Sequence, residues 1–149
     1  MNACRMEKAY RHWGHDIGEE DTPIEAGLGF VVAFDKKAPF IGRDALLQQK
    51  NQPKLTKRLV QFALENPEPL LYHNEPIYRD GALVGYTSSA AYGHTLGRAI
   101  ALGYVNSPDG VDQAYIDSGQ FEIEVACGRQ PARASMRPLY DPKSARMRI

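Results

Sequence analysis

The chain of 149 residues carries no net formal charge at pH 7, because 18 lysines and arginines balance 18 aspartates and glutamates. Hydrophobic residues make up 43% of it and charged residues 24%, which argues against a disordered protein and against a nucleic-acid-binding one. Two isolated cysteines argue against a disulfide scaffold and a CxxC zinc site, and no apolar run approaches the ~18 residues of a membrane span.

Residues 1–50 are predicted to combine short helices with one strand. In TPIEAGLGFVVAF, the Thr22 hydroxyl can cap a short helix and Glu25 can return the hydrogen bond, with a proline at the first helical position. The FVVAF segment, residues 30–34, is apolar at every position, which predicts a strand buried on both faces. A second helix is predicted over residues 42–50, GRDALLQQK. Because AGLGFVVAF is strongly apolar, we expect this part to pack on the rest of the chain, or otherwise to drive self-association.

Residues 55–140 show short apolar runs with turn signals between them at intervals of roughly ten residues, a pattern typical of all-β regions. LTKRLVQFALE and AIALGYV each predict a strand. Two hairpins are predicted, one around Asp80-Gly81 and one around Gly128. Five or six short antiparallel strands fit a small barrel or a sandwich, and a barrel is favoured because closure leaves no exposed strand edges.

The stretch YTSSAAYGHTLGRAIALGYV, residues 86–105, contains no acidic residue and one arginine. This composition predicts that protein covers both of its sides, with glycines where a strand turns a barrel corner. Its SSAAYGHT portion is expected to be a loop, in which His94 either forms local hydrogen bonds or approaches a ligand.

Several common site motifs are missing from the sequence. Neither serine of SSAAYGHT stands in a GxSxG elbow, so nucleophilic catalysis is not expected, and no GxGxxG nucleotide-binding fingerprint is present. The four histidines are scattered and do not predict a metal site. The sequence therefore predicts neither a catalytic residue nor a metal ligand within the chain.

Five stretches resemble, in chain order, the closing half of the aminomethyltransferase family, the T-protein of the glycine cleavage system. They are RMEKAYRHWG, TPIEAGLGFVV, FIGRDALLQQK, YTSSAAYGHTLGRAIALGYV and RPLYDP, and together they extend over nearly the whole chain. AYGHTLG and RPLYDPKSARMR are more similar to the folate-binding C-terminal region of sarcosine and dimethylglycine dehydrogenases.

The resemblance implies a mostly β fold in which an α+β segment precedes an antiparallel Greek-key β-barrel of about six strands. Residues 1–52 would be the C-terminal end of a folate-binding α/β body, and residues 53–149 would form the barrel. The polar segment QQKNQPK, in which Pro53 disfavours continuation of the preceding helix, agrees with a joint there.

The resemblance also implies three folate-binding residues. Arg5 matches the family arginine that contacts folate, and its guanidinium offers a planar fork of donors. Trp13 stands where the family has a pocket tyrosine, so a stacking face is kept and a hydroxyl is lost. Arg146 lies in a basic tail that, in the family, returns toward the folate. From the residues alone, both arginines are expected on the solvated surface, and the tryptophan would suit the core as well as a pocket.

In the family, the aspartate that polarises the reaction at the folate nitrogen and the glutamate that grips the pterin lie upstream of the position of Arg5. The chain is therefore expected to be the C-terminal part of a larger protein that moves a one-carbon unit from an amine to tetrahydrofolate, and to be inactive alone. Its expected partners are folate, an amine-derived one-carbon donor and the missing N-terminal body, without metal, nucleic acid or membrane. A cytoplasmic location is expected. The alternative is a non-catalytic barrel module that docks onto a partner chain or onto the missing body.

Overall fold

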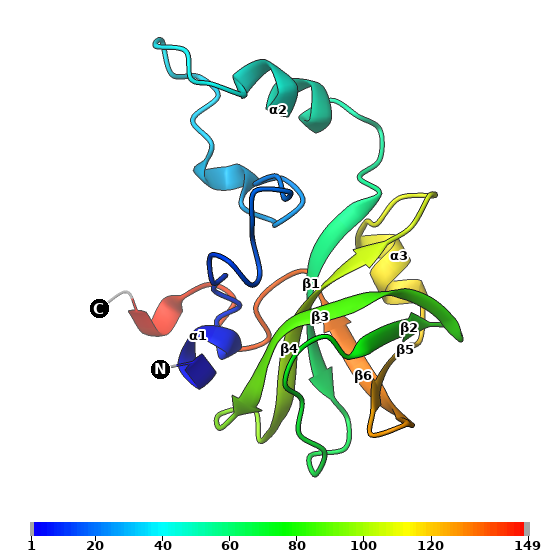
Figure 1. Cartoon of the computed structure of the whole chain (residues 1–149). Helices are drawn as coiled ribbons and strands as arrows, with labels where there is room; N and C mark the ends of the chain where they lie inside the picture. Colours follow the sequence, from blue (N-terminus) through cyan, green and yellow to red (C-terminus); the bar gives the residue numbers. More distant parts are fainter. Residues whose placement is uncertain (1, 148–149) are drawn as a thin grey trace.

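The computed structural model describes residues 2–147 and places a β-barrel beside an N-terminal extension, residues 2–56 (Figure 1). The extension contains α1 (Asn2–Glu7), the short 3-10 helix η1 (Gly29–Val31) and α2 (Arg43–Lys50). The rest of the chain comprises β1 (Lys57–Leu64), β2 (Pro76–Arg79), β3 (Ala82–Gly93), β4 (Arg98–Asn106), α3 (Gln113–Ser118), β5 (Phe121–Val125), β6 (Gly128–Ser135) and the 3-10 helix η2 (Ala145–Met147).

The six strands form a closed antiparallel ring in the order β1-β4-β3-β2-β5-β6. β1 pairs with β4 from Lys57↔Asn106 to Ala63↔Ile100, and the ring is closed where residues 61–64 of β1 pair with residues 132–135 of β6. Every strand therefore has two partners and no edge is exposed. This confirms the predicted mostly β fold with a six-stranded barrel.

The two predicted hairpins are present, and their turns differ in chemistry. Asp80 and Gly81, both with positive φ, join β2 to β3 as predicted. The β5–β6 turn lies at Ala126 and Cys127, which also have positive φ, whereas Gly128 already belongs to β6. Because neither of these two residue types favours the left-handed conformation, the sequence carried no turn signal at their positions.

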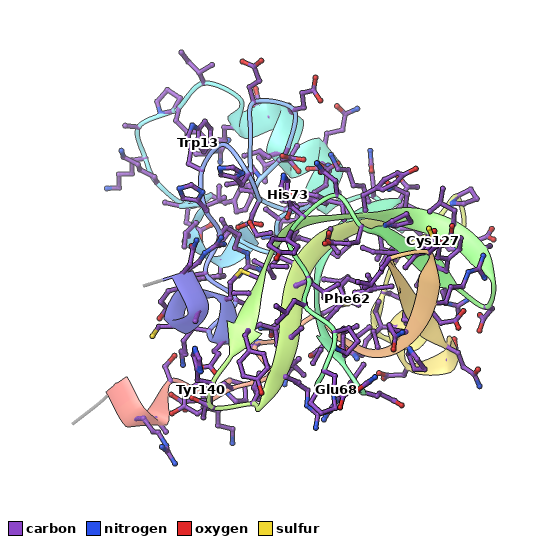
Figure 2. The ribbon with its side chains drawn as sticks, turned by 60° about the horizontal axis from the view of Figure 1, so that its bottom comes forward. Trp13, Phe62, Glu68, His73, Cys127 and Tyr140 are labelled. Atoms are coloured by element: carbon purple, nitrogen blue, oxygen red, sulfur yellow. The ribbon has the colours of Figure 1, made fainter. Side chains whose placement is uncertain are left out.

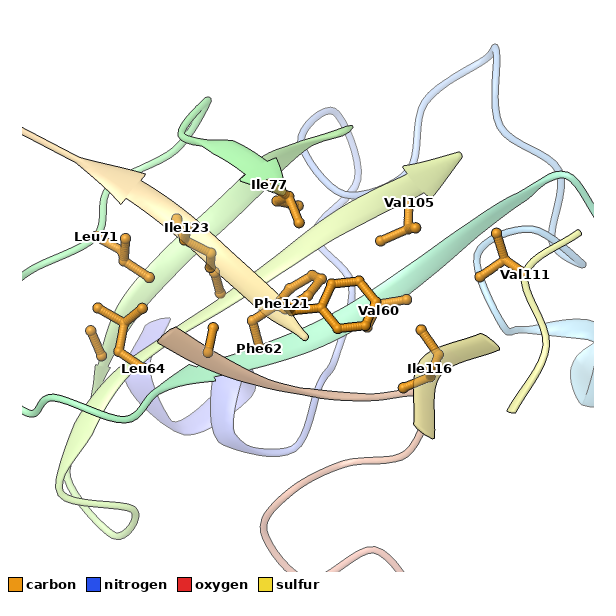
Figure 3. Close-up of a cluster of buried hydrophobic side chains, with 13 residues drawn as sticks. Val60, Phe62, Leu64, Leu71, Ile77, Val105, Val111, Ile116, Phe121 and Ile123 are labelled. Atoms are coloured by element: carbon orange, nitrogen blue, oxygen red, sulfur yellow. The ribbon is translucent and has the colours of Figure 1, made fainter. Parts of the chain in front are cut away.

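The barrel interior is the main hydrophobic core (Figure 3). β1 places Val60, Phe62 and Leu64 in this core, at every second residue, as the strand period requires. The Phe62 ring lies against that of Phe121 of β5, with ring centroids 5.8 Å apart. α3 adds Ile116 to the same cluster.

A second hydrophobic cluster lies between the barrel and α1. Leu59 and Ala63 of β1, together with Ile100 and Leu102 of β4, belong to it with Met6 of α1. These residues alternate along their strands with those that fill the interior, so β1 and β4 are buried on both faces. α1 therefore packs on the outer side of the barrel against β3 and β4, and it reaches β1 through Met6, whose carbonyl oxygen accepts from Gln61.

The predicted buried strand at residues 30–34 is wrong. The segment forms η1 and an irregular loop, and the Phe30 side chain is 83% exposed. Since every barrel strand already has two neighbours, no strand edge is available to pair with this segment. α2, which confirms the second predicted helix, lies in a part of the extension that stands away from the barrel (Figure 1).

The expectation that the first fifty residues pack on the barrel holds only near the N-terminus. Met6, Ala9, Ile24 and Ala26 are buried, whereas residues 29–50 contain no buried residue. Thr22 and Glu25 do exchange the predicted capping hydrogen bonds, at 3.0 and 3.1 Å, although the segment that follows is a turn and not a helix.

β3 includes most of the SSAAYGHT portion that was expected to be a loop. Thr87 pairs with Gly103 and Ser89 pairs with Leu102, so Ser88 is an extra residue and forms a β-bulge. Neighbouring side chains of a regular strand point to opposite faces. The bulge instead directs the hydroxyls of both serines toward the extension.

β3 and β4 approach each other so closely that two glycines are required. A Cβ atom on Gly85 would lie 1.9 Å from the carbonyl oxygen of Tyr104, and one on Gly103 would lie 2.6 Å from that of Tyr86. A side chain at either position would push the strands apart, which agrees with the predicted role of glycines at a barrel corner.

Candidate functional site

The candidate site lies where the extension meets β3, and Arg5 of α1 is at its centre. The Arg5 Nε donates to Asn2 Oδ1 at 3.1 Å, and Nη1 donates to the carboxylate of Asp16 and to the carbonyl oxygen of Tyr10. Nη2 donates to Ser89 Oγ at 3.1 Å. Because a guanidinium has five N–H donors, one on Nη2 is left for a ligand.

Asp16 is fully buried and fixes the orientation of Arg5. Its carboxylate accepts hydrogen bonds from the guanidinium, from the backbone N–H of His12 at 2.8 Å and from Ser88 Oγ at 2.6 Å. The Asp16 carbonyl oxygen accepts from the Tyr104 hydroxyl at 3.0 Å. The buried carboxylate is thus paired and hydrogen-bonded, which offsets the cost of removing it from water.

Arg5 contributes to an open pocket of about 190 Å³. The pocket is lined by polar and aromatic side chains of the extension, of the segment before β2 and of β3, namely Asn2, Arg5, His12, His15, Tyr72, His73, Ser88 and Ser89, with Ala90 beside them. No acidic residue lines the pocket. The nearby Asp16 carboxylate is buried and already accepts hydrogen bonds from protein donors. The lining suits a ligand that presents carboxylate or carbonyl oxygens. We call it the Arg5 pocket.

Histidines surround the mouth of the Arg5 pocket. The rings of His12 and His15 are stacked, with centroids 4.7 Å apart. His73, which also lines the pocket, lies between the extension and the barrel in Figure 2. His94 is exposed in the β3–β4 turn and does not line the Arg5 pocket.

A polar clamp beside the pocket ties the extension to β1 and β4. Lys57 Nζ donates to Asp21 Oδ1 at 2.7 Å and lies 4.5 Å from the centroid of the Tyr104 ring. Burial, together with the nearby Asp21 charge, raises the pKa of Tyr104, so its hydroxyl stays protonated and donates to Asp16. Burial alone would raise the pKa of Asp21, but hydrogen bonds from Lys57 and from the N–H of Gly18 lower it.

The other two predicted folate-binding residues lie outside the pocket. Trp13 lies on the extension, between His12 and His15 in the sequence. Its side chain is 70% exposed and is not part of the pocket lining. The Arg146 guanidinium donates to the Tyr140 hydroxyl at 3.3 Å. Figure 2 shows Tyr140 at the bottom of the view, whereas Trp13 and His73 are in its upper half. The structure therefore places Arg5 in a pocket and does not bring Trp13 or Arg146 to it.

Sequence reasoning missed the partners that hold Arg5. Asp16 stands in HDIGEED among several other acids, and nothing in that pattern marks it as the buried one. Ser88 and Ser89 were noted as a hydroxyl pair, but their common direction depends on the bulge, which is set by pairing with β4.

Among residues 2–147, no three His, Cys, Asp or Glu side chains gather in a way that could hold a metal ion. Within the same range, no helix is long and apolar enough to cross a membrane. Cys4 and Cys127 are both exposed free thiols.

Comparison with known proteins gives one consistent result. Residues 57–141 match the family described as the glycine cleavage T-protein C-terminal barrel domain, and residues 1–36 match the GCVT N-terminal domain. The chain is 44% identical over 149 residues to 4-methylaminobutanoate oxidase (formaldehyde-forming) of Paenarthrobacter nicotinovorans, covering 99% of this chain and 17% of that protein. It is 35% identical over 150 residues to mitochondrial sarcosine dehydrogenase of Homo sapiens, covering 99% of this chain and 16% of that protein.

A solved structure has the same fold. The glycine cleavage system aminomethyltransferase T from Bartonella henselae superposes with a TM-score of 0.76 at 21% identity, over 95% of this chain and 38% of that one. The chain therefore spans about a sixth of the length of the two curated relatives, as the 17% and 16% coverages show.

Proposed function

Because the chain belongs to the glycine cleavage T-protein family through its C-terminal barrel domain, we propose that it is the C-terminal part of a folate-dependent one-carbon transferase. The complete protein would be an aminomethyltransferase or a protein of the sarcosine and dimethylglycine dehydrogenase type. Tetrahydrofolate, when bound, supplies the nitrogen that accepts the carbon unit from the amine. The observation that carries the proposal is the Arg5 pocket, where an arginine matched to a folate contact is held in place by a buried carboxylate.

The residues of the Arg5 pocket fit one end of a folate molecule. Arg5 has a free N–H on Nη2, and the Ser89 hydroxyl and the histidine rings around it can bond to carboxylate or ring oxygens. A volume of about 190 Å³ is below that of most complete ligand pockets, so the remaining part of the folate would contact the N-terminal body that we propose as the partner. The exposed ring of Trp13 is free to stack on that part.

A folate fragment tests the proposal. Benzoylglutamate, which carries an aromatic ring and two carboxylates, is titrated into the chain while backbone and arginine side-chain signals are followed by heteronuclear NMR. We expect weak binding, on the order of millimolar, because a pocket of about 190 Å³ offers few contacts to set against the entropy cost of association. The shifts should centre on Arg5, Ser88 and Ser89, and Arg5→Lys should weaken binding while retaining the charge next to Asp16.

Two matched variants locate the binding site in the same titration. Lys36→Gln removes an exposed positive charge on the loop before α2 and should leave the affinity unchanged. Arg146→Gln tests whether the basic tail contributes. Shifts that centre away from Arg5 and are insensitive to Arg5→Lys would contradict the proposal.

The chain alone is proposed to lack turnover. In the family, the carboxylates that act on the folate nitrogen and the pterin lie upstream of Arg5, and most of the rate acceleration of such reactions comes from preorganised electrostatics. Incubation of the purified chain with tetrahydrofolate and N-(hydroxymethyl)glycine, a donor whose carbon is already at the methylene oxidation level, should give no methylene-tetrahydrofolate above the uncatalysed rate. Two further expectations stay predictions: the domain boundary between residues 52 and 53, and the cytoplasmic location of the protein.

A non-catalytic docking module is the second candidate, and a different observation favours it. Phe30, Val31 and Ile41 are strongly exposed on a segment without any buried residue. Exposed apolar side chains of this kind mark contact surfaces. A module that only docks would show no benzoylglutamate shifts in the Arg5 pocket, which separates the two candidates.

A further inference from the structure

The part of the chain that follows β6 forms a groove rich in positive charge. Arg133 and Ser135 lie on β6, where they alternate with the core-facing Ala132 and Ala134, and Arg137 follows in the bend after the strand. The chain then turns back through Pro142, and Lys143 faces them across a groove of about 490 Å³. We call it the basic groove.

The three cations of the basic groove are not neutralised. Among the described residues, the side chains of Arg133, Arg137 and Lys143 make no ion pair and no hydrogen bond, and no acidic residue lines the groove. Asp141 is the one acid within residues 137–143, and its carboxylate is engaged elsewhere: it accepts from Lys8 Nζ at 3.0 Å and from the N–H of Ala145 at 2.8 Å.

Apart from Asp141, the acids closest to the groove are those of an adjacent cavity. Arg133 also lines a neighbouring cavity, which contains Glu65, Asp117 and Glu122. None of these acids lies within ion-pair distance of Arg133 in the described structure. Arg137 and Lys143 line no cavity with these acids.

The backbone under these cations is held in one conformation. Ser135 Oγ donates to the carbonyl oxygen of Arg137 at 2.8 Å and accepts from its N–H at 3.2 Å. The N–H of Leu139 donates at 2.7 Å to Gln61 Oε1, and the Gln61 side chain is buried. Pro138 and Pro142 restrict the chain further. A groove fixed in this way loses little entropy when a ligand binds.

The apolar residues that line the groove are Pro138, Leu139 and Pro142, and we call them its floor. An apolar floor between separated cations fits a small organic molecule whose anionic groups are carried on an apolar frame. Arginine binds carboxylate and phosphate groups through paired N–H donors, so both chemistries suit the rim. The volume of the groove lies within the range of small-molecule sites.

We propose that the basic groove is a binding site for a small organic polyanion that carries at least two carboxylate or phosphate groups. The site shares no lining residue with the Arg5 pocket, and the proposal does not depend on the proposed folate function. Arg137 and Lys143 bind the anionic groups, and the Pro138–Leu139 floor contacts the frame.

The test uses trimesate, a benzene ring with three carboxylates, titrated into the 149-residue chain at neutral pH and low salt. Heteronuclear NMR should show saturable shifts at Ser135, Arg137 and Leu139, and the affinity should fall as salt is added. The uncharged trimethyl ester should not bind. Pyrophosphate forms a second arm: binding tighter than that of trimesate would narrow the ligand class to phosphates, and weaker binding would narrow it to carboxylates.

Variants assign the binding to the groove. Arg137→Gln should weaken trimesate binding by about tenfold, since one charge-assisted contact is lost, and the double variant with Lys143→Gln should weaken it further. Lys37→Gln, which removes an exposed charge in the extension, serves as the matched control and should leave the affinity unchanged. The proposal is overturned if neither anion binds, or if Arg137→Gln and Lys37→Gln have equal effects.

Discussion

Asp16 is the side chain whose loss should be most costly, because it is a fully buried charge that accepts from three donors. Asp16→Asn leaves Arg5 without its counter-charge in a largely buried setting. We expect the free energy of unfolding, measured by urea denaturation, to fall by about 3 kcal/mol. Asp44→Asn is the control, since the Asp44 side chain is 97% exposed in its ion pair with Arg43, and it should change stability by less than about 0.5 kcal/mol. Equal losses in the two variants would mean that the Arg5 network does not stabilise the fold.

Asp21 should make the attachment of the extension sensitive to acid. Its pKa in the folded protein is lowered below 3.8, because the hydrogen bonds from Lys57 and Gly18 outweigh the opposing effect of burial. The stabilisation is therefore fully present above the ordinary carboxyl pKa and is lost as the pH falls through the lowered folded value.

The variant Asp21→Asn tests this pH dependence. The stability difference between the wild-type chain and Asp21→Asn, measured by urea unfolding, should shrink as the pH is lowered from about 5 to about 3. Asp35→Asn removes an exposed carboxylate that has no ion pair in the described part of the chain, and its difference from wild type should stay flat. A difference for Asp21→Asn that is independent of pH would contradict the assignment.

The pairing of β3 with β4 depends on the absence of a side chain at Gly85. A Cβ there would meet a backbone oxygen at 1.9 Å, and only movement of a strand could relieve the clash. Gly85→Ala should therefore lower the free energy of unfolding by about 2 to 3 kcal/mol. Gly128→Ala is the matched control, because the nearest atom to its Cβ lies at 3.5 Å, and thermal unfolding should show less than about 1 kcal/mol of loss. A mild effect of Gly85→Ala would show that the two strands can separate at little cost.

Elements that depend on neighbouring residues were predictable from the sequence. The Asp80-Gly81 turn and the reciprocal bonds of Thr22 and Glu25 are set by chemistry within a few residues, and both are present. The barrel could be predicted because short apolar runs and turns repeat along residues 55–140. The family resemblance rested on motifs that the comparisons confirm.

Elements that depend on distant partners were not predictable in this way. FVVAF at residues 30–34 has the composition of a buried strand, but a strand also needs a free edge, and the closed ring offers none. The outer faces of β1 and β4 are buried because residues far along the chain, among them Met6 and Leu139, pack on them. The bulge at Ser88 and the burial of Asp16 likewise arise from contacts with segments far along the chain.

The chain as a unit should associate with itself through the apolar part of the extension. Phe30, Val31 and Ile41 expose apolar surface that no described residue covers. Sedimentation velocity should show a weight-average coefficient that rises with concentration, and the double variant Phe30→Ser, Ile41→Ser should abolish the rise. Leu83→Ser changes a half-exposed residue on β3 and should leave association intact. A monomer at all concentrations would contradict this expectation.

Closure of the ring by β1 and β6 has a consequence for how fast the protein folds. Residues 61–64 of β1 can pair only after residues 132–135 of β6 have come close to them in space. Lys8 likewise bonds to Asp141, which is 133 positions away in the sequence. Contacts so distant along the chain require a large loss of loop entropy before they contribute any stabilisation. Refolding should therefore take milliseconds to seconds, as in other β topologies of high contact order, and the hairpins β2–β3 and β5–β6 should form before the seam between β1 and β6.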